Sequence, residues 1–152
     1  NLALIYSEIP VDAEEKAMWT AFCASSFKEV LSFYTKDKYP YENAMASHNY
    51  ATALMDFPPA KIHDNLKKAA GLFNDALEVR TAHEYPFERA LTLLNQLELG
   101  WLTHNDDSSE ELKKYEDMKA KAEEVKILVG DINLISQAND HLKELEKVKN
   151  LI

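Results

Sequence analysis

The sequence predicts an all-α protein of stacked antiparallel helical hairpins, closed at its C-terminal end by a capping helix. Turn-forming residues are sparse, since the 152 residues include only three glycines and five prolines. The long segments between them carry apolar residues at steps of three and four, which is helical spacing. A proline-centred phrase also occurs twice, and repetition at a fixed period is typical of helical-repeat architectures.

The repeated phrase reads "FYTKDKYPYENAM" at 33–45 and "VRTAHEYPFERAL" at 79–91, at one constant offset (86 − 40 = 46). The matched residues are Thr35 and Thr81, Tyr39 and Tyr85, Pro40 and Pro86, Glu42 and Glu88, and Ala44 and Ala90. Each proline precedes a helical pattern, where a first-turn N–H has no partner in the helix. We therefore expect one helical-repeat domain, 1–152, with a partial repeat 1–38, a repeat 39–84, a degenerate repeat 85–128 and a capping helix 131–150.

The first three complete helical segments are expected near 12–36, 41–56 and 60–82. Their apolar stripes are Trp19, Phe22, Cys23, Phe27, Val30, Leu31 and Tyr34; Ala44, Ala51 and Leu54; and Ile62, Leu66, Ala69, Ala70, Phe73, Ala76 and Leu77. The segment 87–102 is apolar nearly all round, which predicts a helix buried between neighbours.

The polar stretch "THNDDSSEEL" predicts a turn in which Ser108 or Ser109 caps the next helix. That helix is expected to bury Leu112, Tyr115, Met118, Ala122 and Val125. Gly130 suits a C′ position and Asp131 the following N-cap. The last helix carries Ile132, Ile135, Leu142, Leu145 and Val148 on one side, which brings the expected total to about seven helices.

Several short patterns resemble tetratricopeptide (TPR) repeats with lengthened helices. "Leu2-Ala3-x-x-Tyr6" is similar to the family's L-G-x-x-Y, and "Ala69-x-x-x-Phe73" followed by Pro86 is similar to its A-x-x-x-F…P. Cys23, Phe27 and Pro40 repeat the second pattern. The fuller phrase is similar to kinesin-light-chain-like arrays and to bacterial arrays that accompany caspase-like proteases. Gln96 and Leu97 depart from the pattern, since leucine and a small residue are expected there, and this departure predicts looser packing of the third hairpin.

The resemblance implies a non-enzymatic module that binds a peptide or helix of a partner protein, or another domain of its own parent chain. By the family's pattern, the first helix of each hairpin lines the binding face, and we expect the partner-binding residues to be Met45, His48, Asn49, Thr52, Asn95 and Glu98. Leu94 and Trp101 share that face but are expected in the core. Asn49 and Asn95 either hold a peptide backbone through their amides or hydrogen-bond between neighbouring helices. Glu98 would favour a basic ligand.

The composition bounds the alternatives. A net charge of −9 disfavours nucleic acid and anionic membranes as partners. A single cysteine favours a reducing, cytoplasmic setting, and no apolar run approaches the roughly 18 residues that span a bilayer. Cys23 is interpreted as core, and His104 with Asp106 and Asp107 as a solvated turn. No catalytic motif is visible, so neither a catalytic residue, a metal nor a cofactor is expected.

Three other hypotheses stay open, and one of them is a helical-bundle enzyme or metal protein. The last helix has Ile135, Ala138, Leu142, Leu145 and Ile152 near heptad spacing, so it caps the stack or forms a homodimer. If the helix forms a homodimer, the chain is a structural or self-assembling element. Alternatively, it is a sensor array that regulates a fused or neighbouring enzyme.

Overall fold

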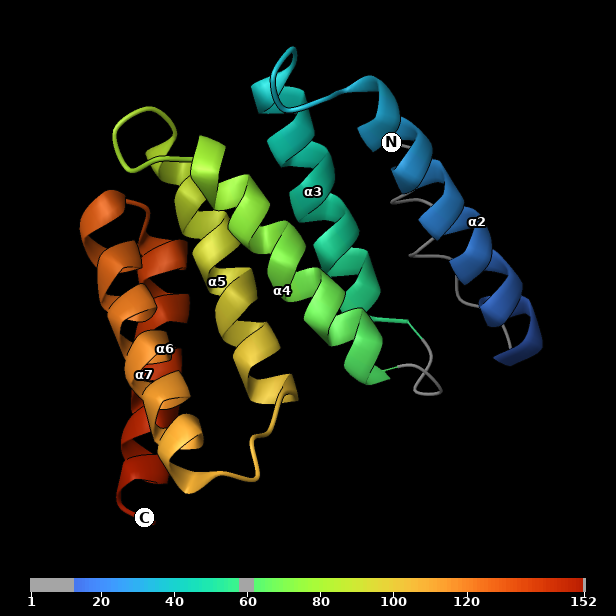
Figure 1. Ribbon diagram of the computed structural model, residues 1–152. Coiled ribbons are helices and arrows are strands. Elements are labelled where there is room, and N and C mark those ends of the chain that lie inside the picture. The colour runs from blue at the N-terminus through green and yellow to red at the C-terminus, as the bar shows by residue number, and fades with distance from the viewer. Residues whose placement is uncertain (1–12, 58–61, 152) are drawn as a thin grey trace. The chain divides into compact units, whose positions relative to one another are not determined.

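The computed structural model describes residues 13–57 and 62–151, and every regular element in these two ranges is an α-helix (Figure 1). The expected all-α class is therefore confirmed. The helices are α2 (Ala13–Phe33), α3 (Pro40–Met55), α4 (Ile62–Val79), α5 (Pro86–Leu102), α6 (Ser108–Leu128) and α7 (Ile132–Lys149). The pattern at Leu2, Ala3 and Tyr6 lies outside the described residues.

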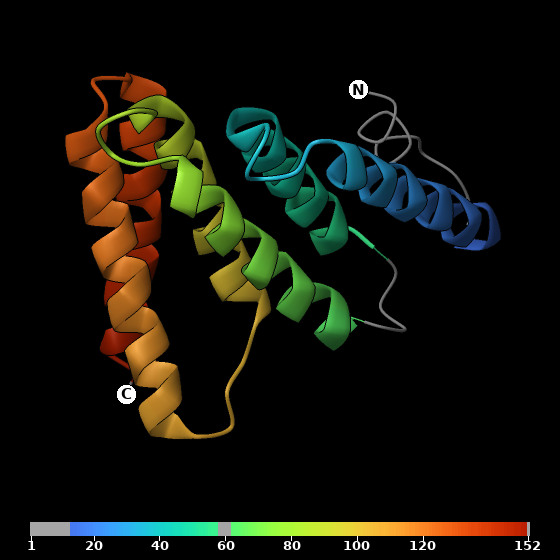
Figure 2. The ribbon, with the colours of Figure 1, turned by 45° about the horizontal axis from the view of Figure 1, so that its top comes forward.

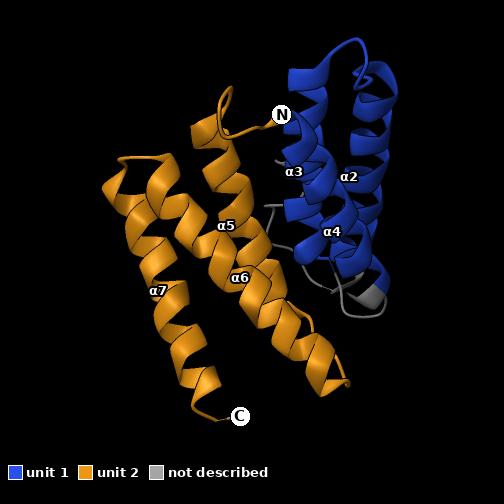
Figure 3. Cartoon of the chain, turned by 60° about the vertical axis from the view of Figure 1, so that its left-hand side comes forward, with its two compact units in different colours: residues 1–79 blue, residues 80–152 orange. Residues whose placement is uncertain are grey.

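The chain divides into two compact units, Asn1–Val79 and Arg80–Ile152 (Figure 3). In the first unit α3 packs against both α2 and α4. In the second unit α5 packs against α6 and α7, and α6 and α7 also pack against each other. Each helix thus lies against its neighbours in sequence within its own unit, as expected for helical hairpins.

The connection that leads into α3 has the same geometry as the one that leads into α5. Pro40 and Pro86 are the first helical residues, and the backbone of Tyr39 (φ −135°, ψ 64°) matches that of Tyr85 (φ −136°, ψ 59°). The N–H of Tyr39 donates to the carbonyl of Thr35 at 2.8 Å, and that of Tyr85 to the carbonyl of Thr81 at 3.0 Å. The repeated phrase therefore encodes a repeated turn.

A side chain in the first turn of each of these helices closes the preceding connection. Asn43 Nδ2 donates to the carbonyl of Tyr34 at 2.7 Å. Arg89, 46 residues later, donates from Nη1 to the carbonyl of Arg80 at 3.1 Å. Carbonyls at a helix C-terminus lack partners in the helix, so both side chains supply one. An amide and a guanidinium fill the same role because both are hydrogen-bond donors of sufficient reach.

Burial follows the same offset. The buried residues of α3 are Ala44, Ala46, Ser47, Tyr50, Ala51, Ala53 and Leu54. Their counterparts in α5 are all buried as well: Ala90, Thr92, Leu93, Gln96, Leu97, Leu99 and Gly100. In the preceding helices, Cys23 and Ala69 match at 0% exposure, as do Phe27 and Phe73. Equivalent positions of the repeated helices are thus buried, although their side chains differ.

The α5–α6 hairpin is close-packed at Gly100. A Cβ placed on Gly100 would lie 2.6 Å from Sδ of Met118, so the absence of a side chain lets α6 approach α5 there. Leu97 itself is fully buried. The prediction of a looser third hairpin was therefore wrong, because the small residue lies three positions beyond the expected one.

Five residues that were expected to be buried are exposed. Phe22 of α2 is 51% exposed, and Phe87 and Leu102 of α5 are 46% and 50% exposed. Leu112 of α6 is 45% exposed, and Ile132 of α7 is 83% exposed. In α7 the buried residues are Leu134, Ala138 and Leu145. The buried face of α7 is therefore rotated away from the face that Ile132 and Ile135 indicated.

The caps of the last two helices agree in part with expectation. Asp131 is the N-cap of α7, and its side chain accepts the N–H of Leu134. Asp107, rather than Ser108 or Ser109, caps α6 by accepting the N–H groups of Ser109 and Glu110. Gly130 follows the C-cap Val129 as expected but does not adopt a positive φ. Figure 2 shows the connection 103–107 running from the end of α5 to the start of α6.

Candidate binding groove

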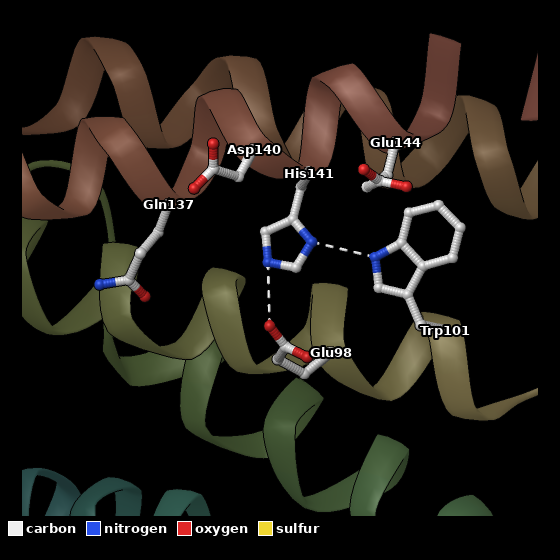
Figure 4. A pocket seen from close by; sticks show the side chains of 6 residues that line it. All are labelled: Glu98, Trp101, Gln137, Asp140, His141 and Glu144. Carbon is white, nitrogen blue, oxygen red and sulfur yellow. Dashed lines mark hydrogen bonds and ion pairs between the residues drawn. The ribbon is translucent and has the colours of Figure 1, made fainter. Parts of the chain in front are cut away.

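A groove within the second unit lies between α5 and α7 and has a volume of about 440 Å³ (Figure 4). Two of its lining residues come from α5 and four from α7: Glu98, Trp101, Gln137, Asp140, His141 and Glu144. Figure 4 shows the side chains of Glu98 and Trp101 directed toward His141. The groove thus combines an indole, an imidazole, an amide and three carboxylates.

The packing of α7 places its polar side chains in this groove. Leu134, Ala138 and Leu145 are buried, and together they anchor α7 against its neighbours in the unit. Residues three and four apart share a helix face, so His141 lies between Ala138 and Leu145 along the buried stripe. Its side chain is only 11% exposed.

His141 is held from two sides by residues of α5. The Nε1–H of Trp101 donates to Nδ1 of His141 at 2.9 Å. Nε2 of His141 lies 3.2 Å from Oε1 of Glu98. Because Nδ1 accepts the indole proton, the neutral imidazole carries its proton on Nε2 and donates it to Glu98. These two hydrogen bonds orient the indole of Trp101 and the carboxylate of Glu98.

The carboxylates make the groove negative. No lysine or arginine is among its lining residues. The two acids on α7 have lysine partners one turn along, with Asp140 paired to Lys143 at 3.7 Å and Glu144 to Lys147 at 2.6 Å. All four of these side chains are well exposed, and exposed i,i+3 pairs contribute only about 0.5 kcal/mol each. These lysines therefore offset only a small part of the negative charge of the two acids.

Glu111 fixes the connection beside the groove. Its Oε2 accepts the N–H of Asn105 at 2.9 Å, and its Oε1 accepts from Lys114 at 2.7 Å. Lys114 also donates to the carbonyl of Thr103 at 2.7 Å, which ties the end of α5 to α6. Partial burial acts to raise the pKa of Glu111, but hydrogen bonds from Lys114, Tyr115 and Asn105 outweigh it and lower this pKa to about 2.

Tyr115 links this connection to the groove. Its ring packs against Trp101 with the centroids 6.0 Å apart. The hydrogen bond that it donates to Glu111 raises the pKa of the phenol, because the carboxylate stabilises the protonated form. The indole of Trp101 is therefore supported from α6 as well as from α7.

In the first unit, the four expected binding residues lie on α3 with different exposures. Met45 is 39% exposed. His48, Asn49 and Thr52 are half-buried. The ring of His48 packs edge-on against Phe73 at 5.7 Å, and the hydroxyl of Thr52 donates to the carbonyl of His48 at 2.9 Å. Met45 is thus the most exposed of the four.

In the second unit, Glu98 is exposed and Asn95 is half-buried. Leu94 is buried, as expected. Trp101 was expected in the core, but it is half-buried and lines the groove. For Asn49 and Asn95, peptide binding and hydrogen bonding between helices both stay predictions.

The four lining residues on α7 are not among the binding residues expected from the sequence. They are Gln137, Asp140, His141 and Glu144. A signal for this face exists in the spacing of Leu134, Ala138, His141 and Leu145, at steps of four, three and four. It was obscured because Ile135 and Leu142 form a second apolar stripe on the same helix.

Other reactive side chains are accounted for by packing. Cys23 is fully buried, and burial raises the pKa of its thiol to about 11. Across 13–57 and 62–151, no three His, Cys, Asp or Glu side chains gather in a way that could hold a metal ion. None of the described helices is long and apolar enough to cross a membrane.

Comparison with known proteins adds no family assignment: no family model matches the chain, and neither a curated protein nor a solved structure matches it.

Proposed function

We propose that this chain is a TPR-like, non-enzymatic module that binds a peptide or helix of a partner protein, or another domain of its parent chain. The observation that carries the proposal is the groove between α5 and α7. Its α5 wall consists of Glu98 and Trp101, two of the residues that the TPR resemblance places on the inner face. In such arrays the inner face is the usual binding surface.

The preformed geometry of the groove supports this proposal. Trp101 and Glu98 are each held by His141, so little side-chain entropy remains to be lost when a partner binds. The groove also presents the ring of Trp101, and aromatic residues are enriched at protein–protein interfaces. On α3 of the first unit, Met45 offers an exposed apolar side chain for the same purpose.

The test is affinity capture from native lysate with the whole chain as bait, read by quantitative mass spectrometry. Glu98→Arg alters the groove, and Met45→Arg alters the expected face of α3. Glu116→Arg on α6 and Asp75→Arg on α4 are matched controls, because both residues are exposed and neither lies on an expected binding face. Circular dichroism and thermal unfolding verify that all four variants fold.

The proposal predicts a captured protein whose yield falls at least roughly tenfold with Glu98→Arg, since reversing a charge in an interface costs more than 1.4 kcal/mol. The same protein is retained by both controls. Equal retention by all four variants would contradict the proposal.

The self-assembly alternative is distinguished by mass. Ala138 and Leu145, two residues of the expected dimer stripe, are already buried within the unit. Ile152, another member of the stripe, lies outside the described residues. Light scattering across concentrations therefore decides between the two: a mass that doubles with concentration favours self-assembly, and a constant monomer mass favours the partner-binding proposal.

A further inference from the structure

We infer that the groove between α5 and α7 takes a cationic side chain, that of an arginine or lysine in a basic segment of a partner protein. This inference rests on the proposed function and names the chemistry of the ligand. It follows from the three carboxylates of Glu98, Asp140 and Glu144, which line the same groove as the indole of Trp101.

Three carboxylates on two helices surround one space of about 440 Å³. A single positive charge placed there is attracted by all three, whereas an anionic or apolar group gains nothing from them. The carboxylates accept the N–H donors of a guanidinium or an ammonium in charge-assisted hydrogen bonds. The charge pattern therefore selects a cation over an acid or a hydrocarbon.

The indole gives the groove more than negative charge. A cation over the face of a tryptophan is attracted by the ring quadrupole, and tryptophan is the most effective side chain for this contact. Trp101 is fixed in place because its N–H is donated to His141 and its ring packs against Tyr115. A planar guanidinium can stack on the indole while its N–H groups face the carboxylates, so arginine is expected to bind more tightly than lysine.

The two lysines that pair with acids of the groove are not among its lining residues. Lys143 and Lys147 are 72% and 69% exposed, and each pairs with an acid of its own helix one turn earlier. Nδ1 of His141 accepts a hydrogen bond from the indole N–H of Trp101, which fits the neutral form of the imidazole. Unlike the exposed acids of α6, these carboxylates therefore line the same groove as a tryptophan ring.

The test is nuclear magnetic resonance of the whole chain, with the two indole N–H signals as reporters. The chain contains two tryptophans, Trp19 in the first unit and Trp101 in the groove, so each titration carries an internal control. The Trp19→Phe variant assigns the two signals. The probes are four uncharged-end peptides that are identical except for a central arginine, lysine, glutamine or glutamate.

The inference predicts that the arginine peptide shifts the Trp101 signal in a saturable way, while the Trp19 signal stays in place. The lysine peptide binds more weakly, and the glutamine and glutamate peptides at least about tenfold more weakly than arginine. Raising the salt to about 0.5 M weakens binding several-fold, because the Debye length then falls below about 5 Å.

Matched variants separate the groove from the net charge of −9, which attracts basic peptides everywhere. Glu98→Gln removes a charge but keeps a carbonyl oxygen that can accept a hydrogen bond from Nε2 of His141. The hydrogen bonds that join Trp101, His141 and residue 98 are therefore kept. Glu144→Gln is a second variant on the exposed lip. Each variant is expected to lower the affinity for the arginine peptide about fivefold or more, whereas Glu116→Gln on α6 changes this affinity less than about twofold.

Three results would overturn the inference. Equal losses with Glu98→Gln and Glu116→Gln would indicate only a diffuse charge effect. Stronger binding of the glutamine or glutamate peptide at Trp101 would leave the binding module standing with a different ligand. The inference would also be refuted if only the Trp19 signal shifted, or if no peptide shifted the Trp101 signal at concentrations up to about 1 mM. A dissociation constant of about 1 mM corresponds to a binding free energy of only about 4 kcal/mol.

Discussion

Replacing Gly100 by alanine tests how α5 and α6 pack in the second unit. The added Cβ would lie 2.6 Å from Sδ, 2.9 Å from Cε and 3.1 Å from Cγ of Met118, so the methionine has to move. Met118 is 2% exposed and surrounded by other core atoms, which restricts that movement. Overpacking of this kind costs about 1–3 kcal/mol.

Helix propensity opposes this cost. Alanine is favoured over glycine inside a helix by about 0.5–1 kcal/mol, and a flexible methionine relieves part of the clash. The net expectation for Gly100→Ala is a loss of about 1 kcal/mol in the free energy of unfolding of the second unit. Gly130→Ala is the matched control, because a Cβ there meets nothing within 4 Å. It is expected to be neutral or to stabilise by about 0.5 kcal/mol through the unfolded state.

The assay is urea unfolding followed by the fluorescence of Trp101 in a Trp19→Phe background, so that the signal comes from the second unit alone. A double-mutant cycle with Met118→Ala isolates the contact, since the smaller side chain makes room for the new Cβ. The two substitutions should couple favourably by about 1 kcal/mol or more. If Gly100→Ala stabilises the unit as Gly130→Ala does, or if the coupling is zero, the close approach at Gly100 is refuted.

Three further outcomes follow from individual contacts. The pKa of Glu111 is lowered from 4.5 to about 2, so its carboxylate stabilises the fold above about pH 4.5, and this stabilisation is lost as the pH falls toward 2. Glu111→Gln should therefore lower the free energy of unfolding, measured in urea, by about 2 kcal/mol near neutral pH and by almost nothing near pH 2. Because the pKa of Cys23 rises from 9.0 to about 11, its thiolate fraction near neutral pH falls about 100-fold, and thiol-reagent kinetics should show at least that much slower labelling in the folded chain than in denaturant. Asn43→Ala should cost about 1 kcal/mol in thermal or urea unfolding because the carbonyl of Tyr34 loses its donor, while Asn43→Arg should recover part of that loss, as Arg89 fills the equivalent position.

Local signals predicted the helices and their connections well. Pro40 and Pro86 begin helices because a proline at the first helical position needs no N–H partner. Asp131 caps α7 for an equally local reason, since its carboxylate reaches an N–H within the first turn. The constant offset of the repeated phrase extended these predictions from one hairpin to the next.

The groove could not be predicted in the same way, because it depends on how α7 is rotated against α5. The sequence of α7 contains two apolar stripes, and only packing against its neighbours selects Leu134, Ala138 and Leu145 over Ile132 and Ile135. A histidine in the selected stripe is inconspicuous in the sequence. The contact between Trp101 and His141 joins residues 40 positions apart, so no local pattern contains it.

The position of the close helix contact was also nonlocal. The TPR resemblance directed attention to Leu97, where the family has a small residue. In the structure, the small residue at the close helix contact is Gly100, because Met118 of α6 lies against it. Which residue meets Met118 depends on the register between the two helices. Register is a property of the packed pair rather than of either helix alone.

The most direct test of the account is site-specific photo-crosslinking of a partner through the groove. The whole chain is produced with a benzophenone amino acid in place of Gln137, which lines the groove, or in place of Glu116, which is exposed on α6. The account predicts that the position 137 probe crosslinks to a basic segment of another protein after irradiation and that the position 116 probe does not. Crosslinks from position 116 but not from position 137, or crosslinks only to other copies of the same chain, would contradict it.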